Sequence, residues 1–198
     1  MTHPKRADTS APLHPLLAER WSPRSFDPFH QLDDADLHPL LEAARWAPSA
    51  NNSQPWRFLV TRRGGDDFTR LHAALNPGNQ TWAGAASALL LVAAHTVDEA
   101  GRPRPYALYD TGQAVAHLAV QAQAHGLALH QMGGFDAAAV RDAFGLDPAL
   151  TPVVVVALGR VDAPDRLPAP LAERERTPRQ RHALDSLLLA PDPAVAPA

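Results

Sequence analysis

The spacing of apolar residues along the chain changes between the period of a helix and the period of a strand. In residues 37–44 the leucines recur on one helix face, and Asp33 or Asp34 can cap the start of that helix. Pro48 follows its last turn, and the residue before a proline is pushed out of the helical region. Residues 56–61 then favour a strand. The pattern therefore predicts a helix, a short loop and a strand in succession.

The same reasoning predicts elements in the rest of the chain. Gly126 and Gly145 stand where helices end, and the Asn-Pro-Gly sequence at 76–78 predicts a turn. The run at 152–159 is the most hydrophobic and is expected to be a central strand. The remaining predicted strands are 88–93 and 127–132, and the remaining predicted helices are 13–22, 66–75, 107–125 and 136–144.

Composition divides the chain into one domain and two tails. Residues 1–12 and 191–198 are expected to be disordered, which leaves 13–190 as a single domain. Residues 95–105 contain charges, glycine and proline and are expected to form an exposed loop. From Arg160 onwards, prolines, arginines and glutamates predict an arm that lies over the surface.

Length and charge exclude several classes of protein. The 198 residues suffice for one domain with a sizeable core, and 45% hydrophobic with 20% charged residues is typical of a soluble globular protein. A net charge of −3 predicts no attraction to nucleic acid. The longest apolar run is too short to span a membrane, and no secretory signal is visible. The absence of cysteine excludes disulfides and thiolate chemistry and fits a cytoplasmic protein.

The stretch between Pro48 and Pro55 is the first candidate for ligand chemistry. It consists of Ser49, Ala50, Asn51, Asn52, Ser53 and Gln54. Amides carry donors and acceptors on short stems, which suits a heteroaromatic ring with carbonyl groups and ring nitrogens. A structural turn would more often use glycine. From the loop alone, a binding loop and a polar turn are about equal alternatives.

A second candidate is an Arg-x-Ser-x-Arg turn near the start of the domain. Arg20 and Arg24, with the Ser22 hydroxyl between them, form a plausible phosphate clamp, because arginine binds phosphate oxygens bidentately. The alternative is a solvated basic turn. The Gly133–Gly134 pair after a strand is a weaker signal, which can expose backbone N–H groups to a ligand or form only a tight turn.

Several common motifs are missing from the sequence. It contains no G-x-G-x-x-G, no Walker A and no G-x-S-x-G, which argues against a Rossmann dinucleotide site, a P-loop and an α/β-hydrolase. None of the ten histidines pairs with a glutamate in the metalloprotease pattern, so no metal site is expected.

In the order of its motifs the chain resembles the nitroreductase family of FMN-dependent oxidoreductases. The resemblance covers roughly residues 13–188, and the motif at 43–56 is the specific one. The similar segments are 20–26, 43–56, the surroundings of Asn79, 109–114, 126–136 and 179–184.

The resemblance implies an FMN site built from four groups of residues. The FMN phosphate and ribityl chain would be held by Arg20, Ser22, Arg24, Arg179 and Arg181, with a backbone contact from Trp21. The flavin edge would be covered from the other subunit by Pro48, Ser49, Ala50, Asn52 and Gln54. Asn79 would face the pyrimidine carbonyl, and Gln131, Met132, Gly133 and Gly134 would line the N5 side. Arg174 and Arg176 offer a competing Arg-x-Arg pair in the arm.

Three residues depart from the family's motifs. Trp21 stands where many relatives have a basic or polar residue, and Ala50 replaces a frequent serine. Gly133 stands where some relatives carry glutamate, which could widen the pocket. None of these changes removes the arginines of the clamp.

The resemblance also implies a fold and an activity. The expected fold is α+β, with a mixed, mainly antiparallel sheet flanked by helices, in an intertwined homodimer with two FMN sites at its interface. The expected activity is ping-pong hydride transfer from NADH or NADPH through FMN to nitroaromatic, quinone or similar small-molecule acceptors, with no dedicated catalytic acid or base. The alternatives are a flavin enzyme of another reaction type (dehalogenase, dehydrogenase or flavin-cleaving) and a non-catalytic flavin-binding dimer.

Overall fold

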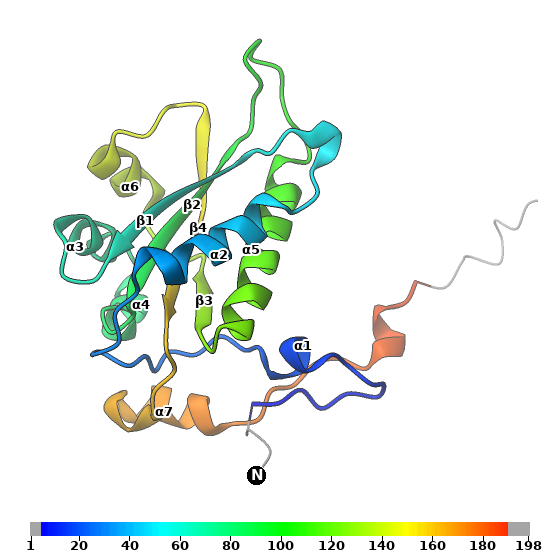
Figure 1. Ribbon diagram of the computed structural model, residues 1–198, viewed down its shortest axis with the longest axis vertical. Coiled ribbons are helices and arrows are strands. Elements are labelled where there is room, and N and C mark those ends of the chain that lie inside the picture. The colour runs from blue at the N-terminus through cyan, green and yellow to red at the C-terminus, as the bar shows by residue number, and fades with distance from the viewer. Residues whose placement is uncertain (1–4, 190–198) are drawn as a thin grey trace, which may run out of the picture.

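Four strands form one sheet in which each neighbouring pair is antiparallel. The computed structural model describes residues 5–189, and Figure 1 shows the sheet between two sets of helices. The strand order is β1-β2-β4-β3. The strands are β1 (Trp56–Arg62), β2 (Ala88–His95), β3 (Ala128–Met132) and β4 (Leu150–Gly159). β2 and β4 are central, as the hydrophobic run at 152–159 predicts.

Helices cover both faces of the sheet. α2 (Asp34–Arg45) and α5 (Ala107–Ala124) pack on one face, and α3 (Asp66–Ala73), α4 (Pro77–Ala83) and α6 (Ala137–Phe144) lie on the other (Figure 1). Side chains of a strand alternate between faces. Leu90 therefore belongs to the core under α2 and α5, while Leu89 and Leu91 belong to the opposite core. This double burial explains why β2 is apolar at nearly every position.

Local sequence signals account for the ends of several elements. Asp33 caps α2 by accepting from the Asp36 N–H at 2.9 Å, and the Asp36 carboxylate accepts from the Asp33 N–H in return. Gly145 ends α6 in the left-handed conformation with φ of 57°. In β4, Pro152 sits beside an irregularity in the β2 pairing, where a missing N–H interrupts no regular ladder.

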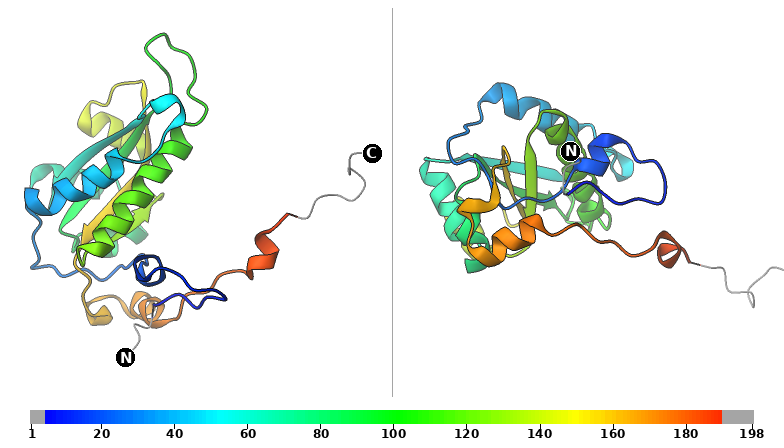
Figure 2. Two further views of the ribbon diagram at one scale, coloured as in Figure 1. Left: turned by 45° about the vertical axis from the view of Figure 1, so that its right-hand side comes forward. Right: turned by 90° about the horizontal axis from the view of Figure 1, so that it is seen from below.

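The first and last segments that the structure describes lie beyond one end of the sheet, outside its two helical layers. α1 (Pro15–Glu19), α7 (Ala169–Arg176) and the 3-10 turns Pro164–Arg166 and Leu184–Leu187 are found there, and Figure 2 shows residues after α7 extending away from the domain. Residues 1–4 and 190–198 lie outside the described residues.

Part of the expected N-terminal tail has defined contacts. Lys5 is buried and donates from Nζ to the Arg174 carbonyl at 2.7 Å and to the Thr177 carbonyl. The Ala7 N–H donates to the Ala18 carbonyl at 2.7 Å. The first described residues are therefore fastened to α1 and α7.

The α+β class expected from the sequence is confirmed, and one element was predicted wrongly. The Asn-Pro-Gly sequence at 76–78 starts α4 and is not a turn. Pro77 occupies the first helical position, where its missing N–H costs nothing, and extended Asn76 precedes it. The loop after α2 also contains a 3-10 turn, η1 (Ala50–Asn52), which the sequence does not predict.

Candidate functional site

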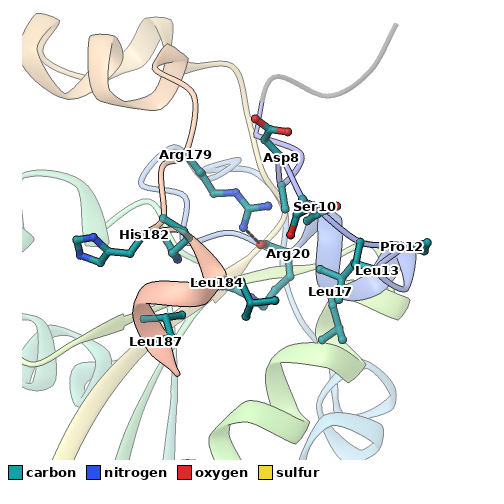
Figure 3. Close-up of a pocket in the computed structure, with 14 residues that line it drawn as sticks. Asp8, Ser10, Pro12, Leu13, Leu17, Arg20, Arg179, His182, Leu184 and Leu187 are labelled. Carbon is teal, nitrogen blue, oxygen red and sulfur yellow. Dashed lines mark hydrogen bonds between the residues drawn. The ribbon is translucent and has the colours of Figure 1, made fainter. Parts of the chain in front are cut away.

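Three arginines line one cavity between α1, the N-terminal segment and the arm. Arg20, Arg179 and Arg181 share this cavity of about 430 Å³ with residues of segment 7–13, and we call them the arginine cluster. Figure 3 shows Arg20 and Arg179 close together, with Asp8 and Ser10 beside them. Within residues 5–189, no ion pair includes a member of the cluster.

The arginine cluster brings positively charged guanidinium groups together where they are partly shielded from solvent. Burial, and then the charge of Arg181, lower the pKa of Arg20. Burial, followed by the charges of Arg20 and Arg181, lowers the pKa of Arg179. Arginine remains protonated despite such shifts. A bound anion would relieve this repulsion, so the cluster has the electrostatics of an anion site.

The Arg179 side chain is hydrogen-bonded to backbone carbonyls at the end of α1. It donates from Nη1 to the Arg20 carbonyl at 2.6 Å and from Nη2 to the Ala18 carbonyl at 2.5 Å. Carbonyls at a helix C-terminus lack partners within the helix, and a cation there is favourable. The remaining Nε of Arg179 is buried without a hydrogen-bond partner. Arg179 therefore fixes the arm beside Arg20.

Arg24, Trp21 and Ser22, the other predicted phosphate-binding residues near Arg20, do not line the cavity of the arginine cluster. Arg24 pairs with the buried Glu175 on α7 at 3.4 Å, and the Arg24 N–H donates to the same carboxylate at 3.1 Å. Trp21 lies under the Lys5 ammonium, 5.2 Å from its ring centre, and lines a separate cavity. Ser22 is exposed. The structure thus brings Arg20 into the cluster and leaves Arg24 outside it.

The two candidate arginine pairs of the arm lie in different places. Arg176 pairs with Asp165 at 2.5 Å, and the exposed Arg174 lies on the same helix. Neither lines the cavity of the arginine cluster, whereas Arg179 and Arg181 both do. Proximity to Arg20 therefore distinguishes the pair at 179 and 181.

The predicted amide loop, residues 48–55, is shaped by its own hydrogen bonds. The Gln54 N–H donates to the Ser49 hydroxyl at 3.1 Å, and Gln54 Nε2 donates to the Asn52 carbonyl at 3.2 Å. Asn51, Asn52 and Gln54 all have positive φ. Asparagine tolerates this conformation, but glutamine does so less readily. The strained backbone leaves the Asn52 and Gln54 side chains exposed, as it does Pro48.

Asp110 is a supporting residue whose role the sequence did not reveal. It is buried on α5, and its Oδ2 accepts from the Ala50 N–H at 3.1 Å. The carboxylate thereby ties the amide loop to the first turn of α5. Its signal in the sequence was an acidic residue among the apolar positions of a buried helix face.

Asn79 and the glycine pair meet at the exposed end of β3. Asn79 Nδ2 donates to the Gly134 carbonyl at 3.0 Å. A Cβ on Gly134 would lie 3.0 Å from the Asn76 amide nitrogen and 3.1 Å from that of Asn79, so any larger residue here would require both amides to shift. Gln131 is exposed, while Met132 is buried in the core under α3, α4 and α6. Only the backbone of Met132 can face a ligand.

The arginine cluster and the amide loop lie at opposite ends of α5. Asp110 holds the loop at the first turn, whereas Trp21 and Gln123 line a common cavity near the last turn. The α-helix rises about 1.5 Å per residue, so Asp110 and Gln123 are separated by roughly 20 Å along the axis of α5. Figure 1 shows the same arrangement, with α1 at one end of α5 and the 3-10 turn of the loop at the other.

Within residues 5–189, no group of three or more histidine, aspartate or glutamate side chains is placed to hold a metal ion. No helix in that range is long and apolar enough to cross a membrane.

The fold and site define an α+β protein with a cluster of three arginines in one cavity and a separate amide-rich loop. A model of the nitroreductase family matches residues 17–74 and 66–160. The chain belongs to the nitroreductase family.

Individual relatives and solved structures are similar over most of the chain. An uncharacterized 15.4 kDa protein of Mycolicibacterium smegmatis is 40% identical over 66% of this chain and 92% of its own length. A putative NAD(P)H nitroreductase, YdgI of Bacillus subtilis, is 28% identical over 73% and 86%. A crystal structure described as an oxidoreductase containing FMN superposes with a TM-score of 0.88 at 34% identity, covering 96% of both chains. A putative nitroreductase in complex with FMN, from Desulfovibrio desulfuricans, gives 0.74 at 26% identity, covering 91% and 99%.

Proposed function

We propose that the protein is an FMN-dependent oxidoreductase that takes hydride from NADH or NADPH and reduces nitroaromatic, quinone or similar small molecules. It works as a homodimer in which each FMN contacts both chains. The observation that carries this proposal is the separation of the arginine cluster from the amide loop along α5. Both are polar and suited to bind a ligand, yet in one chain they lie at opposite ends of α5, between points of the helix roughly 20 Å apart. A second copy of the chain brings the two together.

The arginine cluster fits the phosphate of FMN. A phosphate monoester carries close to two negative charges and needs more than one cation once it is partly desolvated. Arg20 and Arg181 supply two guanidiniums that no carboxylate within residues 5–189 neutralises by an ion pair. Arg179 positions them. Ser22, exposed two residues after Arg20, is available as a hydroxyl donor.

The amide loop and the end of β3 fit the flavin ring. Asn52 and Gln54 of one chain cover the ring held by the other, while Asn79 contacts a pyrimidine carbonyl. Backbone at Met132, Gly133 and Gly134 lines the N5 side. FMN, when bound, supplies the redox chemistry by accepting and returning a hydride's electron pair. The chain's residues bind it, orient it and exclude water, so no dedicated acid or base is required.

The surface around the amide loop supports dimerisation. Large apolar residues are unusually exposed there, at the end of α2 and the start of α5: Trp46, Tyr106, Leu108 and Tyr109 are 73%, 60%, 52% and 68% exposed. Several large apolar residues exposed at neighbouring element ends of a monomer support an interaction surface there. The FMN in the two solved structures, and the similarity to a major NAD(P)H-flavin oxidoreductase of Aliivibrio fischeri (35% identical over 39% of this chain), support the cofactor and donor.

The purified protein tests this proposal directly. We expect it to be yellow, to release FMN and no FAD on denaturation, and to bleach anaerobically with a reduced nicotinamide nucleotide. FMN is expected because the site offers one phosphate cluster and the sequence lacks an adenine-binding glycine motif. Colourless protein that also fails to take up added FMN would contradict the proposal.

A further inference from the structure

A second group of cationic side chains lies beside the amide loop, far from the arginine cluster. Arg57 on β1 donates from Nη1 to the carbonyls of Gln54 at 3.1 Å and Trp56 at 2.7 Å. The His95 N–H, at the end of β2, donates to the Pro55 carbonyl at 2.9 Å. Arg57 and His95 therefore adjoin the last residues of the loop from neighbouring strands.

Arg104 joins this group from the loop that follows β2. Its N–H donates to the Thr96 carbonyl at 2.8 Å, which places it next to His95. Burial, followed by the charges of Arg57 and Arg104, lowers the pKa of His95, while Asp147 acts in the opposite direction. Both arginine side chains are thus close enough to His95 to disfavour its charged form.

The two arginines have unused donors. No ion pair within residues 5–189 includes Arg57 or Arg104, although Arg62 and Arg102 nearby in sequence pair with Asp34 and Asp98. Within residues 5–189, the Arg104 side chain makes no hydrogen bond, and Arg57 uses only its Nη1 group, which donates to backbone carbonyls. A guanidinium offers five N–H donors in a fork that matches phosphate oxygens.

We propose that Arg57 and Arg104, together with His95, bind the 2′-phosphate of NADPH and make the enzyme prefer NADPH to NADH. This inference rests on the proposed function, because the amide loop must border the flavin at which the nicotinamide donates hydride. Two arginines and a histidine suit a group with close to two negative charges better than the single charge of a carboxylate on an acceptor.

The test measures kcat/KM for anaerobic reduction of the bound flavin by NADPH and by NADH. We expect the wild type to favour NADPH at least tenfold. Arg104→Gln and Arg57→Gln should each lower the NADPH/NADH ratio by roughly ten- to hundredfold, the usual effect of losing a hydrogen bond to a charged group. Arg62→Gln, an exposed arginine at the other end of β1, is the matched control and should leave the ratio unchanged.

A binding experiment separates this inference from the proposed function. By calorimetry, 2′,5′-ADP should bind the purified protein more tightly than 5′-AMP, and Arg104→Gln should remove the difference. If 2′,5′-ADP behaves so while neither nucleotide reduces the flavin, the phosphate site stands and the proposed reaction fails. Equal use of NADH and NADPH by the wild type overturns the inference. The inference is also overturned if the variants leave the NADPH/NADH ratio unchanged and alter only the ratio of rates with 4-nitrobenzoate and with uncharged nitrobenzene as acceptors.

Discussion

Arg179 and Arg181 are two residues apart in the arm and behave differently. Arg179 donates from both terminal nitrogens to carbonyls at the end of α1, whereas Arg181 donates, among residues 5–189, only to the adjacent Gln180 carbonyl, at 2.8 Å. The sequence presents them as an equivalent pair. Their division into an arginine fixed on the backbone of α1 and one with only a local contact depends on where the α1 carbonyls lie, and that is a property of the folded backbone.

Gly134 and Gly133 provide a residue-scale prediction with its own control. A Cβ on Gly134 would lie 3.0 Å from the Asn76 amide, whereas a Cβ on Gly133 would meet no atom within 4 Å. We therefore expect Gly134→Ala to lower the free energy of unfolding by about 1–3 kcal/mol, the usual cost of overpacking. Gly133→Ala should change it by less than about 0.5 kcal/mol.

Urea denaturation of the two variants and the wild type measures both values. FMN titration adds a second readout, since displacement of the Asn79 amide from the Gly134 carbonyl should weaken cofactor binding in Gly134→Ala alone. Equal stability of the two variants would show that the Asn76 and Asn79 side chains move aside freely.

At the scale of elements, β3 is joined to the segment before Phe26 through His130. The His130 Nδ1 lies 2.9 Å from the Pro23 carbonyl, which can only accept, so Nδ1 carries the proton. The ring also packs on Trp82 of α4, with 4.6 Å between ring centres. Burial lowers the pKa of His130 to about 4, against the opposing effect of the Pro23 hydrogen bond.

This pKa predicts how stability depends on pH. The unfolded histidine binds a proton near pH 6.5, and the folded one only near pH 4. The unfolded state therefore binds more protons between these values, so the contribution of His130 is fully present above pH 6.5 and is lost as the pH falls towards 4. Between pH 7 and pH 5 we expect the wild type to lose about 2 kcal/mol from this group.

His130→Gln keeps a donor for Pro23 but cannot titrate, so its unfolding free energy should fall less over the same range. His117→Gln, at an exposed position on α5, is the control and should retain the wild-type pH dependence. Parallel pH profiles for wild type and His130→Gln, measured by urea denaturation, would rule out His130 as the source.

The elements that the sequence predicts correctly are those with a strong period or a clear cap. The strand at 88–93 is apolar because both of its faces are buried, and the helix after Asp33 has a capping box. α4 was missed because Pro-Gly at the start of a helix has the same sequence pattern as a turn. The helix is stabilised by the burial of Trp82 and Ala83 in the core, which is a tertiary contact. Propensity is a weak signal wherever tertiary packing decides.

The candidate site was predictable to the extent that its residues are contiguous in sequence. The amide loop lies within eight residues, and the resemblance that identifies it is local. The Asp110 carboxylate that holds this loop, and the Glu175 carboxylate that draws Arg24 away from Arg20, come from 60 and 151 residues further along the chain. No local pattern reports such partners, because they meet only when α5 and the arm have packed.

For the whole molecule, α5 separates the amide loop from the arginine cluster, which form the two halves of each site in the proposed dimer. Its first turn carries the amide loop through Asp110, and its last turn lies near α1 and the arginine cluster. In a two-fold dimer the same surfaces of both chains meet, so the proposed reach of each loop to the partner's cluster would give the dimer two equivalent sites. The proposed FMN then stabilises the dimer by about 2.7 kcal/mol at a hundredfold excess over its dissociation constant.

Mixing two inactive variants tests this arrangement. Arg20→Ala/Arg181→Ala removes the ligand-facing arginines, and Asn52→Ala/Gln54→Ala removes the amides. After subunit exchange, each heterodimer has one site with both defects and one site with intact arginines and intact amides. Half of all dimers are then heterodimers, so roughly a quarter of wild-type reductase activity should return. Exchange is verified with differently tagged chains, and each variant alone serves as the control. If activity stays absent once heterodimers are shown to have formed, the two half-sites act within the same chain and α5 does not separate them between subunits.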